Sequence, residues 1–287
     1  MQRFNLIVVR PEAFVHHQAY SGAANILCAA LRRLGHLARV ADNQMIRDAT
    51  NIVFGAHYLE PDLVDALPPG TIIYNTEMVV SYSPFLPALI PFVRRFETWD
   101  YSEANVRAWR EVGVPERVRW LRPGYIPECT TIDPATPTDI DAIFYGTMTE
   151  RRRIMLDELS AIGVRVQYLQ NMYGAARDAY IARAKLVLNI HSRPDSMFEI
   201  ARVSQALSNH RVLVSELGTR DDVDPDLREG IALAPLSELA ALCRALLDDD
   251  ARRKALAERG FEVFRSRDFV ASVGAMLAPG AGSEGPL

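Results

Sequence analysis

The feature that most constrains this chain is the regular alternation of short apolar, β-branched runs with longer segments whose apolar residues recur at helical spacing. The clearest helical segment is Ser21–Leu34, which Gly35 closes. Apolar strands that alternate with helices form mainly parallel sheets with both faces covered. The sequence therefore predicts an α/β fold. The strands expected in the first part of the chain are Asn5–Val9, Leu37–Val40, Asn51–Phe54, Thr71–Tyr74, Phe96–Trp99 and Val118–Leu121.

The same alternation begins a second time after a stretch rich in proline and threonine. A chain of 287 residues is long enough for two Rossmann-like halves. We expect a linker over 129–138 between an N-terminal domain, 1–128, and a C-terminal domain, 139–268. Residues 269–287 form the expected tail, whose glycine-rich end is predicted to be disordered. The second-half strands are expected at Asp141–Tyr145, Val164–Tyr168, Leu186–Ile190, Val212–Ser215 and Gly230–Leu233, and helices at Leu236–Leu247 and Asp250–Phe264.

Charge and composition narrow the class of protein. The formal net charge of −4 gives no reason to expect a nucleic acid partner. The apolar runs are far shorter than the roughly 20 residues that span a bilayer, so no transmembrane segment is expected, and peripheral membrane contact is left open. The chain begins with a strand rather than a secretory signal, which favours a cytoplasmic location. Cys28, Cys129 and Cys243 do not form a disulfide or zinc pattern, and the oligomeric state is not predicted.

Polar residues that follow the strands of the second half are candidates for ligand binding, because ligands of open parallel sheets bind beyond the carboxyl ends of the strands. The first expected strand is followed by Gly146 and Thr147, and then by three arginines at the start of a helix, Arg151–Arg153. Amides at a helix start favour anions, and a guanidinium matches phosphate oxygens. This segment predicts a phosphate site that includes Arg152. The alternative is a solvated basic helix face.

A second group of polar residues lies around the strand Leu186–Ile190. Lys185 and Asn189 belong to this region, and His191 follows the strand directly. Glu199 and Arg202 are three residues apart, which places them on one face of the next helix. A carboxylate suits ribose hydroxyls and a cation suits a diphosphate. The alternatives are a hydrogen-bonded core histidine and a structural Glu–Arg ion pair.

These segments resemble the GT-B glycosyltransferases, and most of all a group-1-like subset related to spore-maturation glycosyltransferases. The resemblance covers roughly residues 70–216. It implies two Rossmann-like domains with mainly parallel sheets facing across a cleft, with the nucleotide-sugar on the C-terminal domain and the acceptor on the N-terminal one. The similar segments are Ile73-Tyr-Asn-Thr-Glu77, Trp99-Asp-Tyr-Ser102 with Asn105, Pro123-Gly-Tyr125, Phe144-Tyr-Gly146, Leu186–His191, Phe198-Glu199, Arg202 and Val214-Ser-Glu216.

The resemblance implies transfer of a sugar from a nucleotide-diphosphate donor to a hydroxyl acceptor, such as a glycan, a natural product or a protein, by a hexosyltransferase type of enzyme without a bound cofactor. No acidic pair of the Asp-x-Asp kind follows an expected strand, so no essential metal is expected. Phe198 joins the donor side. Many retaining members carry two glutamates here, and we align the second with Gln205, which is uncharged. The alternatives are a nucleotide-sugar epimerase or hydrolase and a non-catalytic nucleotide-sugar-binding protein. The sugar, base, acceptor and anomeric outcome are not predicted.

The N-terminal half supplies candidates for a catalytic base, which an inverting sugar transfer needs near the acceptor hydroxyl. Glu77 is the first choice because a strand leads directly to it, and His57 is the second. The alternative for Glu77 is a cap on a helix that begins near Ser83. Further candidates are His16 for catalysis and His17, Asp100 and Tyr101 for the acceptor side.

Overall fold

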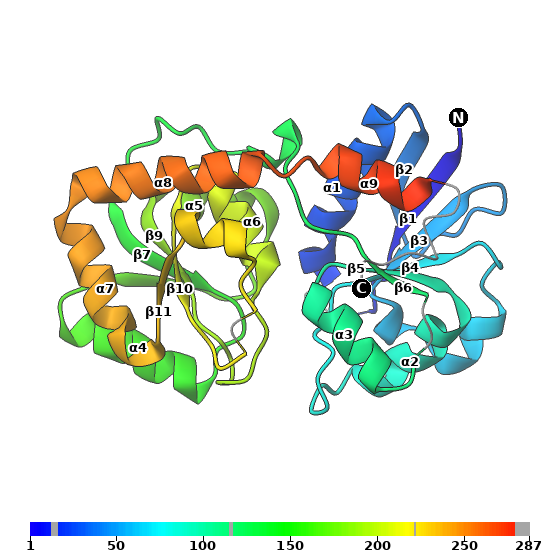
Figure 1. Ribbon diagram of the computed structural model, residues 1–287, viewed down its shortest axis with the longest axis horizontal. Helices are drawn as coiled ribbons and strands as arrows, with labels where there is room; N and C mark the ends of the chain where they lie inside the picture. Colours follow the sequence, from blue (N-terminus) through cyan, green and yellow to red (C-terminus); the bar gives the residue numbers. More distant parts are fainter. Residues whose placement is uncertain (13–16, 115–116, 221, 279–287) are drawn as a thin grey trace. The chain divides into compact units, whose positions relative to one another are not determined.

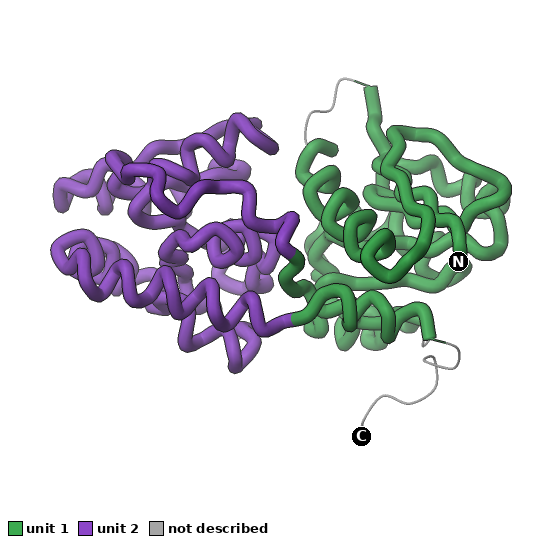
Figure 2. The backbone as a smooth tube through the Cα atoms, turned by 90° about the horizontal axis from the view of Figure 1, so that it is seen from above, with its two compact units in different colours: residues 1–126, 268–287 green, residues 127–267 purple. Residues whose placement is uncertain are grey.

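The chain folds into two compact units, each built around its own parallel sheet. The computed structural model describes residues 1–12, 17–114, 117–220 and 222–278. Unit 1 combines Met1–Ile126 with the C-terminal segment from Asp268, and unit 2 is Pro127–Arg267 (Figure 2). In the described part of the chain, no helix has the length and apolar character needed to cross a membrane.

Unit 1 contains a six-stranded sheet in the order β2-β1-β3-β4-β5-β6, in which all paired strands run parallel. The chain moves outward from β1 to β2 and then continues on the other side from β3, so the strand order reverses between β1 and β3. That reversal is the switch point at which open parallel sheets offer a crevice for ligands. The strands are β1 (Arg3–Val8), β2 (Leu37–Asp42), β3 (Thr50–Phe54), β4 (Ile72–Asn75), β5 (Glu97–Asp100) and β6 (Val118–Trp120).

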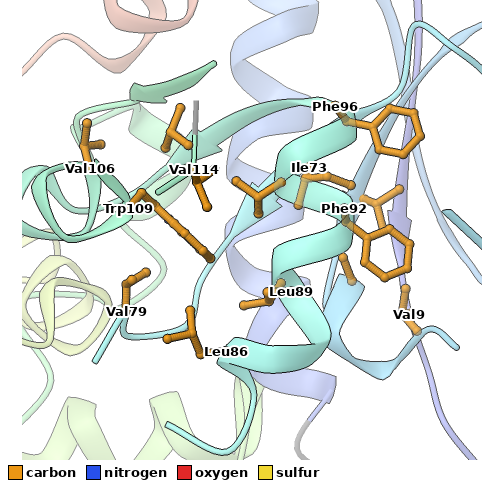
Figure 3. Packing of buried hydrophobic residues seen from close by; sticks show 14 of the residues in the cluster. Val9, Ile73, Val79, Leu86, Leu89, Phe92, Phe96, Val106, Trp109 and Val114 are labelled. Carbon is orange, nitrogen blue, oxygen red and sulfur yellow. The ribbon is translucent and has the colours of Figure 1, made fainter. Parts of the chain in front are cut away.

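Helices cover both faces of this sheet (Figure 1). One face carries α1 (Gln18–Arg33) with α9 (Phe269–Leu277) packed against it, and the other carries α2 (Leu86–Arg95) and α3 (Glu103–Glu111). The α2–α3 face holds an apolar cluster, in which Leu89 and Phe92 of α2 and Trp109 of α3 pack on the strands (Figure 3). Short 3₁₀ segments at Ala56–Tyr58 and Pro61–Asp65 connect β3 to β4.

Unit 2 contains a five-stranded parallel sheet in the order β11-β10-β9-β7-β8, with its switch point between β7 and β9. Apolar side chains of α4 and α7 pack against one side of the strands, and α5 and α6 pack against β9 as well. The elements are β7 (Ile140–Tyr145), α4 (Glu150–Ala161), β8 (Val166–Leu169), α5 (Gly174–Arg183), β9 (Ala184–Asn189), α6 (Ile200–Leu207), β10 (Val212–Glu216), β11 (Ala232–Ala234), α7 (Leu236–Asp248) and α8 (Asp250–Arg265).

The predicted α/β class with parallel sheets is confirmed, and every expected strand overlaps an observed one. Two segments differ from the expected domain scheme. Residues 129–138, expected as a linker, belong to unit 2, where the amides of Thr131 and Ile132 donate to the Asn209 side chain over 2.8 and 2.9 Å. The expected tail begins with α9, which belongs to unit 1 because its apolar residues Phe269 and Val273 are buried there. The composition of both segments suggested a linker and a tail, but it did not indicate the residues with which they pack.

Candidate active site

The carboxyl ends of β7 and β9 meet at the switch point of unit 2, and Gly146 forms the turn that leaves β7. Its φ of +132° lies in a region that side chains avoid. A Cβ at this position would lie 2.9 Å from Nη2 of Arg202. Glycine is therefore needed twice here, for the backbone conformation and for the space that the guanidinium occupies.

Two arginines and one glutamate, Arg152, Glu199 and Arg202, form a buried cluster beside this turn, which we call the Arg–Glu–Arg cluster. Glu199 accepts from Nη2 of Arg152 at 2.8 Å and from Nη1 of Arg202 at 2.7 Å. Arg152 also donates to the carbonyl of Ile190 at 2.9 Å and to that of Thr147 at 2.7 Å. The strand ends and helix starts thus fix the guanidinium of Arg152 from three directions.

Arg202 is held in the same way from α6. It donates to the carbonyl of Tyr145 at 2.8 Å and to the side chain of Asn189. The Phe144 ring lies 5.2 Å from the guanidinium carbon of Arg152 and 5.5 Å from that of Arg202. Such distances are within the range of cation–π contacts, so the ring supports both cations.

The Arg–Glu–Arg cluster carries one more positive than negative charge. Burial opposes ionisation of Glu199, but the charges of Arg202 and Arg152 prevail and lower its pKa, so the carboxylate is ionised at neutral pH. Its side chain is 27% exposed, whereas those of Arg152 and Arg202 are 4% and 6% exposed. Nε of Arg202 is buried and has no hydrogen-bond partner among the described residues. The cluster can therefore attract an anion and present a carboxylate to hydroxyl groups.

A second ion pair, Arg151–Glu216, borders the cluster. Glu216 ends β10, receives Nη1 of Arg151 at 2.7 Å and accepts the backbone amide of His191 at 3.0 Å. The His191 ring is buried, and neither ring nitrogen has a hydrogen-bond partner in the described part of the chain. A Cβ on Gly218 would lie 2.7 Å from its Nδ1. Burial lowers the pKa of His191 despite the nearby Glu216, so the ring is neutral. The alternative of a hydrogen-bonded core histidine does not hold within the described residues.

Four expected members of the donor side lie outside the cluster. Lys185 is a correction: it lies at the amino end of β9, four residues before Asn189, and pairs with Asp141 at 3.1 Å. Gln205 donates to Asp178 of α5 at 3.2 Å rather than joining Glu199. Phe198 is buried, and its backbone amide donates to Asp222 at 3.0 Å while its carbonyl accepts from the amide of Ile200 at 3.0 Å. Thr147 contacts the cluster through its backbone carbonyl, which accepts from Nη1 of Arg152.

The arginines at the start of α4 divide between the two alternatives that the sequence left open. Arg151 and Arg152 point into the sheet edge and make the contacts described above. Arg153 pairs with Glu150 and with Asp157 at 2.8 Å, and its side chain is 54% exposed. Arg153 is thus part of a solvated helix face, whereas its two predecessors belong to the candidate site.

Unit 1 has its own polar cluster at the carboxyl edge of its sheet, around Glu77. The hydroxyl of Tyr20 donates to Oε1 of Glu77 at 2.7 Å and lies 3.3 Å from Nε2 of His57. Burial raises the pKa of Glu77, and the hydrogen bond from Tyr20 counters that rise. Burial lowers the pKa of His57 to about 4. Glu77 does not cap a helix, because α2 begins at Leu86 without a side-chain cap.

The main chain of Glu77 is clamped by two asparagines. Its carbonyl accepts from Asn75 and from Asn105, each at 2.9 Å, and its amide donates to Asn75 at 3.1 Å. Asn75 and Asn105 are in turn held by Asp100. The polar residues that end β4 and β5 thus form one support for the position of Glu77.

Asp100 is a correction to the expected acceptor side. Its carboxylate is fully buried and accepts four hydrogen bonds, among them one from Trp109 at 3.0 Å and one from the amide of Ser102 at 2.9 Å. Burial raises its pKa to about 6 despite these bonds. Ser102 caps α3 through its side chain. These four contacts place Asp100 in the support of the strand ends and of α3.

The other acceptor-side candidates in the described part of the chain also belong to unit 1. His17 precedes α1 and is buried, and Tyr101 is half-buried between β5 and α3. His16 lies outside the described residues. Sequence reasoning missed Tyr20 because it occupies an ordinary apolar position of a helix, and only the tertiary structure brings it to Glu77. Asn75 ends a strand and could have been found by the same rule that selected Glu77.

Among the described residues, no group of three or more His, Cys, Asp or Glu side chains is arranged to hold a metal ion. Charge at the unit 2 site comes instead from arginine side chains. The described clusters hold cationic, carboxylate and neutral imidazole groups at the carboxyl edges of two parallel sheets.

The two units define the GT-B fold of glycosyltransferases. Sucrose-phosphate synthase from Thermosynechococcus elongatus aligns with a TM-score of 0.61 and 12% identity, over 96% of this chain and 98% of that one. HepE of Anabaena in complex with UDP aligns with a TM-score of 0.57 and 11% identity, also over 96% and 98%. WaaG, a glycosyltransferase involved in lipopolysaccharide biosynthesis, gives 0.58 and 11% over 97% and 100%. The expected GT-B fold is confirmed, and the narrower spore-maturation subset stays a prediction.

Sequence comparison finds viral relatives. The chain is 25% identical over 188 residues to the uncharacterized protein L140 of Acanthamoeba polyphaga mimivirus. This match covers 65% of this chain and 61% of L140. It is 29% identical over 107 residues to protein L138 of the same virus, and that match spans 12% of L138. The chain thus spans less than two thirds of the relatives it matches. No protein-family model matches it.

Proposed function

We propose that this chain is a glycosyltransferase that moves a sugar from a nucleoside-diphosphate donor, bound at the carboxyl edge of the unit 2 sheet, to a hydroxyl acceptor. The observation that carries the proposal is the Arg–Glu–Arg cluster at the β7–β9 switch point, beside the open turn at Gly146. A net positive charge next to a partly exposed carboxylate matches a diphosphate joined to a ribose.

The diphosphate has two sources of positive potential at this edge. The backbone amides of Thr147 and Met148 donate to no carbonyl among the described residues, and they precede α4, where the helix dipole favours an anion. The cluster supplies the second source. Because the guanidiniums of Arg152 and Arg202 are already fixed by backbone carbonyls, they need little reorganisation as negative charge develops on the leaving diphosphate. We propose that they stabilise this charge without an essential divalent cation.

Glu77 is the proposed base that takes the proton of the acceptor hydroxyl. The acceptor oxygen forms the new bond to the anomeric carbon, the bond from that carbon to the diphosphate breaks, and the proton goes to the carboxylate. Its side chain is 19% exposed, whereas that of His57 is 1% exposed. Only Glu77 of the two can meet a substrate, so we propose His57 as part of its support.

The solved structures that share the fold suggest the first donor to try. HepE is solved with UDP and with UDP-glucose, and a T4 phage β-glucosyltransferase variant, aligned at a TM-score of 0.56, with UDP-glucose. We therefore propose a uridine diphosphate hexose as donor, which makes the enzyme a hexosyltransferase.

Donor binding is tested with a thermal-shift panel of UDP-, GDP-, ADP-, CMP- and dTDP-sugars on the wild type and two neighbouring variants. Arg152→Ala should lose the stabilisation by the preferred donor, because it removes one cation of the cluster. Arg153→Ala is the matched control, because it alters an exposed arginine one residue away and should keep the full shift. Equal shifts in both variants would remove the cluster from the donor site.

Turnover separates the proposed reaction from its alternatives. A glycosyltransferase releases UDP from UDP-glucose in proportion to added acceptor, over a panel of sugars and phenols. UDP-glucose consumed at the same rate without acceptor would indicate a hydrolase or an epimerase. Binding without turnover across the panel would indicate a binding protein. Activity that persists in excess EDTA supports the arginine-based account, and loss of activity that Mn²⁺ restores would refute it.

A further inference from the structure

Tyr20 is the centre of the polar cluster in unit 1, although neither sequence pattern nor strand position marks it. It lies on the first turn of α1, and only 7% of the residue is exposed. Its hydroxyl is 2.7 Å from Oε1 of Glu77, 3.3 Å from Nε2 of His57 and 3.4 Å from the hydroxyl of Tyr58. Three elements, α1, the 3₁₀ segment after β3 and the loop after β4, thus meet at one oxygen atom.

The single proton of the Tyr20 hydroxyl fixes which groups donate and which accept in this hydrogen-bond network. A tyrosine hydroxyl has one proton to donate and two lone pairs with which to accept. Because that proton goes to the carboxylate, His57 and Tyr58 must donate to the hydroxyl oxygen. This requires the neutral histidine with its proton on Nε2, and burial keeps the ring neutral by lowering its pKa to about 4. All protons in the network then point towards Glu77.

The two oxygens of Glu77 are therefore not equivalent. Oε1 receives the proton of Tyr20 and lies 3.9 Å from Nε2 of His57. Oε2 accepts no hydrogen bond from the side chains and amides of the described residues. Tyr20 therefore holds Oε1 but not Oε2, and the Glu77 side chain is 19% exposed.

We propose that Tyr20 is the positioning residue of the base. Its hydroxyl, which His57 and Tyr58 orient, holds Oε1 of Glu77. The Glu77 carboxylate then stays ionised, and its Oε2 meets the acceptor hydroxyl. This inference rests on the proposed role of Glu77. Burial and the charge of Glu77 raise the pKa of Tyr20 well above its ordinary range, so its hydroxyl stays protonated and donates at every working pH. Among the described residues, Tyr20 and His57 face Glu77 from the packed elements, and Tyr58 faces the hydroxyl of Tyr20.

The packing around Tyr20 explains how the hydroxyl keeps its place. Gly55 has a φ of +81°, and a Cβ there would lie 3.4 Å from the Tyr20 ring and 3.3 Å from the Tyr58 ring. The His57 and Tyr58 rings are in contact, with centroids 3.9 Å apart and planes inclined by 51°. The turn at Gly55 therefore brings His57 and Tyr58 against Tyr20 from the end of β3.

The test follows the titration of Glu77 itself, by ¹³C NMR of the full-length protein labelled at glutamate carboxyls, with Glu77→Gln used to assign the signal. Tyr20→Phe should shift the titration midpoint of Glu77 upward by about one pH unit, because the bond it removes favours the ionised form. Tyr58→Phe is the matched control, because its hydroxyl contacts Tyr20 but not Oε1, and it should shift the midpoint by much less. An unchanged midpoint in Tyr20→Phe overturns the inference.

A variant that keeps the shape of the side chain guards against a folding defect. Replacing Tyr20 alone with 3-fluorotyrosine makes the hydroxyl a stronger donor, so the midpoint of Glu77 should fall. A rise or no change with folded protein overturns the inference.

Turnover of UDP-glucose then separates this inference from the proposed function. In Tyr20→Phe, the acid limb of kcat/KM should move up by the same amount as the NMR midpoint, with about tenfold lower activity on that limb and nearly wild-type activity at high pH. A uniform loss at every pH indicates a purely structural role and overturns the inference. If Glu77→Gln is inactive but the limb does not move in Tyr20→Phe, the base stands and the positioning role fails. If Glu77→Gln remains fully active, the proposed base fails first.

Discussion

Gly146→Ala tests whether the turn after β7 is shaped for the Arg–Glu–Arg cluster. The new methyl group would lie 2.9 Å from Nη2 of Arg202, closer than non-bonded atoms approach. The end of an arginine side chain usually moves aside easily. Here it can do so only by leaving the carbonyl of Tyr145, to which Nη2 donates at 2.8 Å. The substitution therefore strains the backbone and disrupts the cluster at once.

The two costs can be estimated separately. An alanine at a φ of +132° costs about 1–3 kcal/mol in backbone strain. Loss of a hydrogen bond from a charged group costs about 1.5–3 kcal/mol. The free energy of unfolding of unit 2 should thus fall by about 2.5–6 kcal/mol. Gly163→Ala is the matched control, because Gly163 has a φ of +79° with open space around its Cβ position, and it should cost about 1–2 kcal/mol.

Urea denaturation measures the stability of both variants, and titration calorimetry with UDP measures their affinity. Gly146→Ala should bind UDP at least tenfold more weakly, whereas Gly163→Ala should bind it like the wild type, because Gly163 follows α4 at the end remote from the cluster. Equal losses of stability in the two variants, with unchanged UDP affinity in both, would show that Arg202 and Gly146 are not coupled as the geometry requires.

Three further substitutions address single groups. Arg202→Lys keeps the charge but loses the fork that reaches both Tyr145 and Glu199, so UDP affinity should drop about tenfold in calorimetry; wild-type affinity would exclude a bidentate role. Glu77→Gln should abolish turnover of UDP-glucose while calorimetry shows normal UDP binding, and retained turnover would end the case for this base. His57→Gln should make stability less acid-sensitive. Because the folded pKa of about 4 lies below the ordinary 6.5, wild-type stability present above pH 6.5 is lost towards pH 4, by up to about 3 kcal/mol relative to the variant. Parallel urea profiles of the two proteins from pH 7 to 4 would contradict this.

The fold could be predicted well because the apolar strands of a parallel sheet are buried on both faces and therefore stand out in the sequence. Leu186–Ile190 and Val212–Ser215 are examples, and both coincide with observed strands to within two residues. What the sequence could not provide was the assignment of the C-terminal segment. Helix α9 has an ordinary helical composition, and only its packing against α1 places it in unit 1.

The site was predictable to the extent that residues follow the carboxyl ends of strands. Gly146 follows β7 and Asn189 ends β9, and the structure brings both together with Arg152, Glu199 and Arg202. Lys185 was misplaced because it was grouped by closeness in sequence, although about 13 Å of extended strand separate it from Asn189. The position of Tyr20 beside Glu77 and the hydrogen bonds of Asp100 to Asn75 and Asn105 depend on contacts that no local sequence pattern indicates.

The return of α9 to unit 1 has a consequence for how the protein is made. Unit 2 is one continuous stretch, Pro127–Arg267, whereas unit 1 is interrupted by the whole of it. During synthesis unit 2 therefore emerges complete before the last helix of unit 1 exists. The surface at the end of α1, where Leu34 lies next to Gly274, therefore stays exposed until α9 is synthesised. Because the entropy of closing a loop grows only with the logarithm of its length, this late docking costs little more than a short connection would. We expect the fragment 127–267 to fold alone, and a fragment that stops at Ile126 to expose apolar surface and aggregate.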